Sequence, residues 1–112
     1  MGPLTLTHSD DLDTLADLVA ALASDLGVAG EAAGSTVEYA RDGRPFAVVD
    51  GSALELCMNP EVAFAATRTT FTTASPRGPG WIRFSPPTAD QFVLDRAAAW
   101  FLSAWRAAEA QG

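Results

Sequence analysis

Two Asp-Gly dipeptides, Asp42-Gly43 and Asp50-Gly51, constrain the fold of this chain more than any other feature of its sequence. Asp and Gly readily adopt the positive φ angles that tight hairpin turns require. Short runs of apolar and β-branched residues flank both dipeptides, which is typical of strands. The sequence therefore predicts an antiparallel meander of three strands, at residues 36–40, 45–49 and 53–58.

The alternation within these runs predicts which side chains point into the core, because successive residues of a strand face opposite sides of a sheet. Two glutamates, Glu38 and Glu55, fall on the side that we expect to face solvent. The side that we expect to face the core carries the apolar residues Val37, Tyr39, Phe46, Val48, Leu54, Leu56 and Met58.

A helix is predicted before the meander, over residues 11–26. Ser9 or Asp10 is suited to cap its N-terminus, and Gly27 stands where a left-handed C-cap belongs. The Gly- and Ala-rich residues 27–34 follow no clear period and are predicted to form a connection. The helical spacing is set by Leu12, Leu15, Val19, Leu22 and Leu26.

Three further segments follow the meander. Asn59-Pro60-Glu61 is a helix start, with Asn as N-cap and Pro at the first helical position, and we expect a short helix to about Arg68. Residues 69–80 are rich in Thr, Ser, Pro and Gly, which predicts a long loop. Residues 81–85 read as a fourth strand that Pro86-Pro87 stops.

The last predicted element is a long helix from Thr88 to about Ala108. Thr88 and Gln91 match the spacing of a capping box. Phe92 and Leu102 fall on or near its polar side, so they are candidates for a dimer interface. Its broad apolar face comprises Val93, Leu94, Ala97, Trp100, Phe101, Ala104, Trp105 and Ala108.

Together these elements predict one α+β domain over residues 1–112. Its sheet would have four, or five, antiparallel strands, with the N- and C-terminal helices packed on one face. At 112 residues, the chain has room for one core of this kind.

Charge and composition exclude several classes of function. Fourteen acidic residues face seven arginines and no lysine, for a formal charge of −7, which disfavours nucleic acid and anionic membranes as partners. The start, Met1-Gly2-Pro3-Leu4, lacks the features of a signal peptide, and no apolar stretch reaches the roughly 18 to 20 residues that span a bilayer. We therefore expect a cytoplasmic protein.

The inventory of reactive side chains is small. Cys57 is the single cysteine and His8 the single histidine, so neither a disulfide nor a His- or Cys-based metal site is expected. The glycine signatures of phosphate and dinucleotide binding are absent from the sequence, and without lysine no Schiff base can form. We expect no metal, no cofactor and no catalytic residue that the sequence can identify.

The best candidate site spans residues 75–83. Arg77 and Arg83 flank the indole of Trp81, and guanidinium groups beside an aromatic wall and a loop can bind a carboxylate or a phosphate. Alternation places Trp81 and Arg83 on one face of the strand, opposite Ile82 and Phe84. The predicted ligand-binding residues are Ser75, Arg77, Trp81 and Arg83.

A structural role explains the same residues. Pro and Gly would shape a turn, Trp81 would cover the edge of the sheet, and the arginines would pair with nearby acids. The sequence leaves both interpretations open.

The chain resembles the MmcQ/YjbR-like proteins in its order of elements and in several short motifs. The similar segments are Arg44-Pro45-Phe46-Ala47-Val48, Leu54-Glu55-Leu56, Asn59-Pro60-Glu61-Val62-Ala63 and Gly80-Trp81-Ile82-Arg83-Phe84. The resemblance implies a CyaY-like arrangement of helices on a small antiparallel sheet, and it brings no catalytic mechanism. A Gly-Trp strand followed by a helix is also similar to small luciferase-like domains of unknown function, which remain the competing assignment.

Three hypotheses of function follow. The first is a binding or interaction domain without catalysis, which contacts an unknown protein or a small anionic ligand through residues 69–83. The second is a small enzyme for an anionic substrate, with Glu38 or Glu55 as general base beside Arg77 and Arg83. The third is a homodimeric regulatory module that associates through Phe92 and Leu102.

Overall fold

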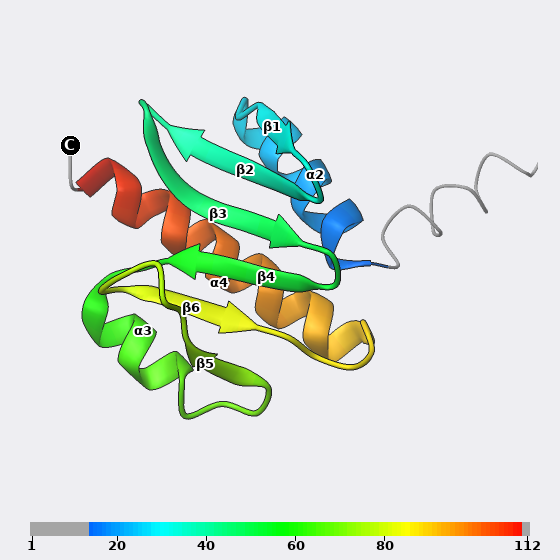
Figure 1. The fold of residues 1–112 in the computed structure, drawn as a ribbon, viewed down its shortest axis with the longest axis vertical. Helices are drawn as coiled ribbons and strands as arrows, with labels where there is room; N and C mark the ends of the chain where they lie inside the picture. Colours follow the sequence, from blue (N-terminus) through cyan, green and yellow to red (C-terminus); the bar gives the residue numbers. More distant parts are fainter. Residues whose placement is uncertain (1–13, 111–112) are drawn as a thin grey trace, which may run out of the picture.

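A computed structural model describes residues 14–110 of the chain. Within these residues, three helices and six strands make an α+β fold, and the strands form one antiparallel sheet in the order β1-β2-β3-β4-β6-β5 (Figure 1). Along the chain the elements are α2 (Leu15–Leu26), β1 (Gly30–Ala33), β2 (Thr36–Arg41), β3 (Arg44–Asp50), β4 (Ala53–Cys57), α3 (Pro60–Ala66), β5 (Thr72–Ala74), β6 (Trp81–Phe84) and α4 (Gln91–Ala110).

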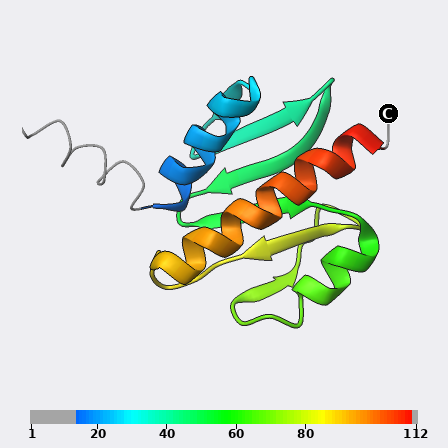
Figure 2. The same ribbon diagram turned by 180° about the vertical axis from the view of Figure 1, so that it is seen from behind.

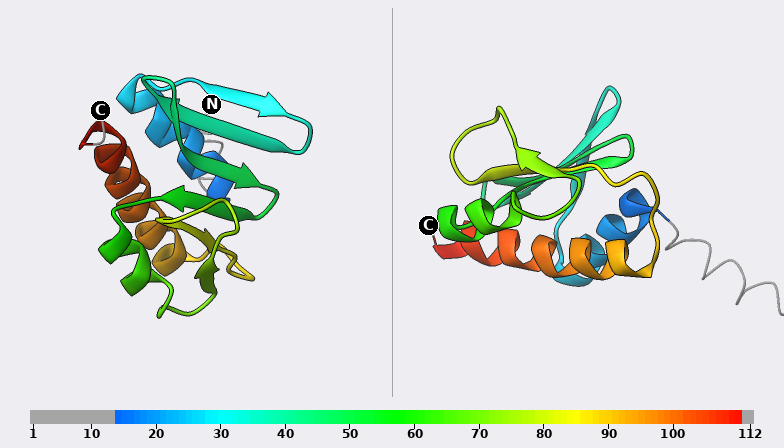
Figure 3. Two further views of the ribbon diagram at one scale, coloured as in Figure 1. Left: turned by 60° about the vertical axis from the view of Figure 1, so that its left-hand side comes forward. Right: turned by 90° about the horizontal axis from the view of Figure 1, so that it is seen from below.

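The three helices of the described part of the chain lie on one face of the sheet, and none of them covers the other face (Figures 2 and 3). The long helix α4 crosses the middle strands, α2 packs beside it, and α3 lies at the end of the sheet formed by β5 and β6. We call the opposite side the helix-free face. Within residues 14–110, no helix is both long and apolar enough to cross a membrane.

Aromatic side chains fill the core between the sheet and α4. The ring of Phe101 lies 5.3 Å from that of Phe46 and 6.0 Å from that of Tyr39, and Phe84 meets Trp100 at 5.2 Å. Tilted and edge-on contacts of this kind add to the free energy of apolar burial. The predicted apolar face of the last helix is confirmed, because Val93, Ala97, Phe101, Ala104 and Ala108 are buried and Leu94, Trp100 and Trp105 pack against the core.

The predicted meander is confirmed as β2, β3 and β4. Asp42 and Gly43 both have positive φ, at 52° and 83°, as a tight turn between two strands requires. The second turn is displaced by one residue, because it uses Gly51 and Ser52, and Asp50 belongs to β3. The displacement puts the side chain of Asp50 on the sheet instead of in a turn.

Two segments that we expected to be irregular contain strands. Residues 27–34 include β1, and residues 69–80 include β5, so the sheet has six strands where four or five were predicted. Both strands lie at edges and are four residues or shorter, and each pairs with a single neighbour. These strands form because their backbones pair with a neighbouring strand. Their side chains are mostly small or polar, so the sequence shows little of the apolar and polar alternation that predicts a strand.

The prediction that Val48 faces the helices is wrong. Val48 lies directly opposite Glu38 on β2 and Glu55 on β4, and such cross-strand partners share a face of the sheet. The pairing shifts between Tyr39 and Ala40, a β-bulge that inserts an extra residue and reverses the alternation around Phe46. Phe46 therefore contacts the core while Val48, only 2% exposed, lies buried on the helix-free face.

Two predicted helix starts also need correction. Thr14 caps α2, its hydroxyl accepting a hydrogen bond from the N–H of Asp17 at 3.1 Å, whereas Ser9 and Asp10 lie outside the described residues. At α4 the carboxylate of Asp90 accepts from the N–H of Val93 at 2.9 Å, so it takes the place that we predicted for Thr88. The Gly27 C-cap and the Asn59 N-cap are confirmed.

Candidate functional site

The candidate site lies on the helix-free face, where β4 pairs with β6. Glu55 of β4 is directly opposite Arg83 of β6, so their side chains leave the sheet on the same side. The connection from β5 to β6 brings Arg77 to the same place. Asp50, at the end of β3, and Ser75 complete a group that we call the Glu55 cluster, namely Asp50, Glu55, Ser75, Arg77 and Arg83.

Glu55 is the centre of this cluster. Its side chain is 7% exposed, and one carboxylate oxygen accepts from Nε of Arg77 and the other from Nη1 of Arg83 at 2.6 Å. Nη1 of Arg83 also donates to the carboxylate of Asp50 at 3.2 Å. A single buried carboxylate thus holds two guanidinium groups together, although their like charges repel each other.

These contacts fix the ionisation of the cluster. Burial raises the pKa of Glu55, but the hydrogen bonds and charges of Arg77 and Arg83 outweigh burial and hold that pKa below its ordinary value. Hydrogen bonds to Glu55 and then to Asp50 raise the pKa of Arg83. At neutral pH Glu55 and Arg83 are therefore both charged.

The loop before β6 is shaped to deliver Arg77. The hydroxyl of Ser75 accepts from the N–H of Arg77 at 3.2 Å, and the N–H of Ser75 donates to the carbonyl of Trp81 at 3.0 Å. Gly80 has φ of 84°, and a Cβ there would lie 2.6 Å from the carbonyl oxygen of Met58. Only glycine allows this approach. The guanidinium of Arg77 then lies 5.6 Å from the ring centre of Trp81, within range of a cation–π contact.

The four predicted ligand-binding residues, Ser75, Arg77, Trp81 and Arg83, thus lie together. Both predicted arginines are paired with acids, as the structural interpretation of this segment expected. Whether the cluster also binds a ligand stays a prediction. The sequence does not point to Asp50 as a site residue, because its Asp-Gly dipeptide predicts a turn, whereas the structure places Asp50 at the end of β3.

The two glutamates proposed as general bases differ in position. Glu55 is in the cluster, but both of its oxygens accept hydrogen bonds from arginines, and its pKa is lowered, so it is a weak proton acceptor. Glu38 lies two strands away, opposite Val48, and makes no ion pair among the described residues. The cluster is thus built to hold charge in place, not to move protons.

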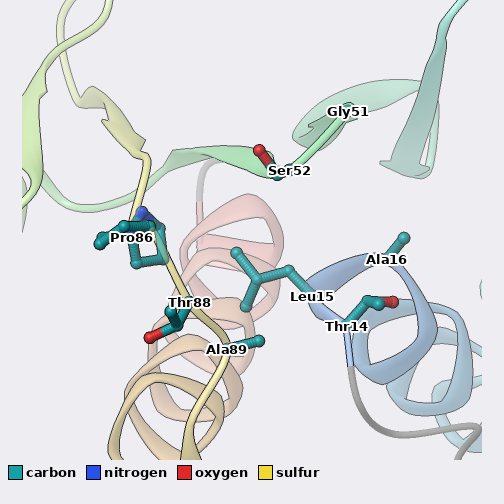
Figure 4. A pocket seen from close by; sticks show the side chains of 9 residues that line it. Thr14, Leu15, Ala16, Gly51, Ser52, Pro86, Thr88 and Ala89 are labelled. Atoms are coloured by element: carbon teal, nitrogen blue, oxygen red, sulfur yellow. The ribbon is translucent and has the colours of Figure 1, made fainter.

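Three surface hollows are lined by residues outside the Glu55 cluster. The largest, about 390 Å³, lies between the start of α2, the β3–β4 turn and the segment before α4 (Figure 4). A second, of about 350 Å³, lies between the end of α2, the β2–β3 turn and Trp105. A third, of about 250 Å³, lies between α3 and the loop leading to Trp81. Of the four predicted ligand-binding residues, Trp81 alone lines one of these three hollows.

The predicted interface residues are not neighbours. Phe92 is 82% exposed near the start of α4, whereas Leu102 is half-buried. They are ten positions apart, which on an α-helix is about 15 Å along the axis and about 80° around it. They do not form one patch on α4.

The other candidates for chemistry are His8, Cys57 and groups of side chains that could bind a metal ion. His8 lies outside the described residues. Burial raises the pKa of Cys57, which is half-buried. Between residues 14 and 110, no three His, Cys, Asp or Glu side chains are grouped so that they could hold a metal ion.

Comparison with known proteins gives no relative. No protein family model, no curated protein and no solved structure matches the chain. The resemblance to the MmcQ/YjbR-like proteins and the competing luciferase-like assignment both remain predictions.

Proposed function

We propose that the chain is a binding domain without catalytic activity of its own, and that it recognises an anionic group of its ligand at Arg77 and Arg83. The single observation that carries this proposal is the arrangement of the two guanidinium groups around Glu55. Each is held in position by the same buried carboxylate, and each keeps part of its side chain at the surface, 41% for Arg77 and 35% for Arg83.

Hydrogen-bond donors remain for a ligand. Glu55 accepts a hydrogen bond from Nε of Arg77, and neither terminal nitrogen of Arg77 has an acceptor among the described residues. The Nε and Nη2 atoms of Arg83 are likewise without one. A guanidinium presents its donors in a fixed fork that matches carboxylate and phosphate. Positions fixed in advance reduce the entropy that is lost on binding.

The indole of Trp81 supports the same proposal. It is half-buried beside Arg77, on the strand that carries Arg83, and also lines the hollow next to α3. An apolar part of a ligand could thus contact the ring while its anionic group meets the arginines. This combination favours an organic acid, a phosphorylated molecule or an acidic side chain of a protein over a simple inorganic ion.

The test is a thermal-shift screen with nucleotides, sugar phosphates, carboxylic acids and short acidic peptides. A ligand that binds only the native state stabilises it by about 2.7 kcal/mol at a hundred times its Kd, which raises Tm by several degrees. The response should be lost in Arg77→Ala and kept in Arg96→Ala. Arg96 is a matched control, because its guanidinium also lies near an indole, 5.8 Å from the ring centre of Trp100. An equal response in both variants would refute the site.

The fold family and the cellular location also belong to this proposal. A CyaY-like arrangement, as in the MmcQ/YjbR-like proteins, is supported by the order of helix, four strands, short helix, two strands and long helix. A cytoplasmic location is part of the same proposal, and it is supported by the single cysteine, since small secreted domains usually carry paired cysteines. A DNA-binding role is disfavoured by the formal charge of −7.

A further inference from the structure

The strand β1 is an open edge of the sheet. It pairs with β2 on one side, and all four of its residues are exposed. Among residues 14–110 it lies at the end of the sheet, with no strand beyond it (Figure 1). An edge strand presents unpaired N–H and C=O groups to which another chain can add a strand.

The register shows which backbone groups point outward. Gly34 and Ser35 form a two-residue turn, and Ala33 and Thr36 flank it as partners. The pair that closes such a hairpin exchanges both of its hydrogen bonds, and hydrogen-bonded and non-hydrogen-bonded pairs then alternate. Ala32 is therefore a non-hydrogen-bonded residue in the pairing with β2. Its N–H and C=O point away from β2.

Two like charges stand side by side on this edge. Glu31 of β1 lies directly opposite Glu38 of β2 on the helix-free face. Neither forms an ion pair with any residue in the described part of the chain. Like charges directly across a strand pair are destabilising, so a cation placed next to Glu31 would relieve an existing repulsion.

The other side of β1 is small and apolar. Gly30 lies against the ring of Tyr39 so closely that a Cβ there would be 2.8 Å from Cε1 of the tyrosine. Ala32 lies opposite the half-buried Val37. A neighbouring strand would thus find acidic side chains on one face and a shallow apolar surface on the other.

We propose that β1 binds an extended segment of a partner protein in which basic and apolar residues alternate, so that the segment becomes a seventh strand. Backbone hydrogen bonds to Ala32 would hold the segment, and Lys or Arg side chains beside Glu31 and Glu38 would select it. This site is separate from the anion site, because three strands, β2, β3 and β4, stand between β1 and the strand that carries Arg83.

The charge pattern favours a different chain over a second copy. If two β1 strands paired antiparallel in a symmetric dimer, Glu31 and Glu38 of both copies would meet on one face. Four carboxylates would then adjoin, and self-association at this edge would increase the repulsion.

The probe is a dye-labelled peptide of alternating Val and Lys, titrated by fluorescence anisotropy. Two control peptides have the same length: one replaces each Lys with Glu, and the other keeps Lys but replaces each Val with Pro, which removes backbone donors. We expect the Val-Lys peptide to bind at least ten times more tightly than either control. Equal affinity for the two Lys peptides would show attraction to net charge alone and would refute strand addition.

Variants of β1 locate the binding. Ala32→Pro removes the outward N–H and should weaken binding at least tenfold, while Ala32→Val keeps it and should bind as the unchanged protein does. Glu31→Gln with Glu38→Gln should weaken binding and reduce its dependence on salt. Far-UV circular dichroism checks that each variant is folded. The proposal would be overturned if a folded Ala32→Pro protein bound the peptide as tightly as the Ala32→Val protein does. It would also be overturned if the protein formed a dimer without peptide and Ala32→Pro dissociated that dimer.

Discussion

Glu55 and Arg83 face each other across the pairing of β4 and β6, and the buried carboxylate of the first accepts a hydrogen bond from Nη1 of the second at 2.6 Å. A carboxylate in this position is not solvated, so its charge depends on the arginines for stabilisation. The pair therefore has consequences for stability, for pH dependence and for the surface that Arg83 and Arg77 present.

Loss of Arg83 should cost more stability than loss of Arg77. Arg83→Ala removes the partner directly opposite Glu55 and leaves a buried carboxylate half-satisfied, and we expect a loss of about 2 to 3 kcal/mol in the free energy of unfolding. Arg77→Ala removes a more exposed partner and should cost about 1 kcal/mol. Urea unfolding measures both.

The control for that comparison is Arg96→Ala, which removes an exposed arginine that has no ion pair among residues 14–110. This substitution should change the free energy of unfolding by no more than about 0.5 kcal/mol. Equal losses in the Arg83 and Arg96 variants would mean that Glu55 does not depend on its partner.

Stability should fall in acid because of Glu55. Its folded-state pKa is lowered below the ordinary value of 4.5, so the unfolded chain binds this proton more readily than the folded chain does. The stabilisation is present above the unfolded pKa and is lost as pH falls through the folded pKa. Between about pH 5 and pH 2, the free energy of unfolding of Glu55→Gln should depend less on pH than that of the unchanged protein. If the free energies of unfolding of the two proteins changed equally with pH, the assignment of this pH dependence to Glu55 would be wrong.

The sequence predicted the middle of the fold well, because its signals there are local. Positive φ at Asp42 and Gly43, the Asn59 cap and the helical spacing of α4 are properties of adjacent residues. The edge strands β1 and β5 depend on pairing with β2 and β6, which no local pattern reports. The bulge at Tyr39 and Ala40 is similarly a property of two strands, and it misplaced Val48.

The candidate site was predicted in its members but not in its organisation. Composition alone pointed to Arg77, Trp81 and Arg83, since arginines are few in this chain. Arg83 lies opposite Glu55 because β6 pairs with β4, and this pairing is a property of the strand order. Alternation correctly placed Glu55 on the helix-free face, but it predicted that the side chain would be solvated. The role of Glu55 as a buried counterion could therefore not be inferred.

Self-association through α4 is a separate prediction. Phe92 is the most exposed large apolar side chain among the described residues, so it is the residue to change. If the homodimer hypothesis holds, sedimentation velocity at micromolar concentration should show a dimer that Phe92→Ser converts to a monomer. Leu102→Ser should have less effect on association, because Leu102 is half-buried. A monomer at all concentrations would remove the hypothesis.

The close approach at Gly80 should be essential to both the fold and the anion site. Gly80→Ala places a methyl group 2.6 Å from the carbonyl oxygen of Met58 at a φ of 84°, whereas Gly27→Ala meets open space at a φ of 74°. Both variants bear the cost of a left-handed alanine, about 1 kcal/mol, and only the first also forces the loop away from β4. We therefore expect Gly80→Ala to lose about 3 kcal/mol in urea unfolding, against about 1 kcal/mol for Gly27→Ala. Because the same loop carries Arg77, the anion response in the thermal-shift screen should weaken in Gly80→Ala and persist in Gly27→Ala. Equal losses of stability in the two variants would show that the loop yields without strain.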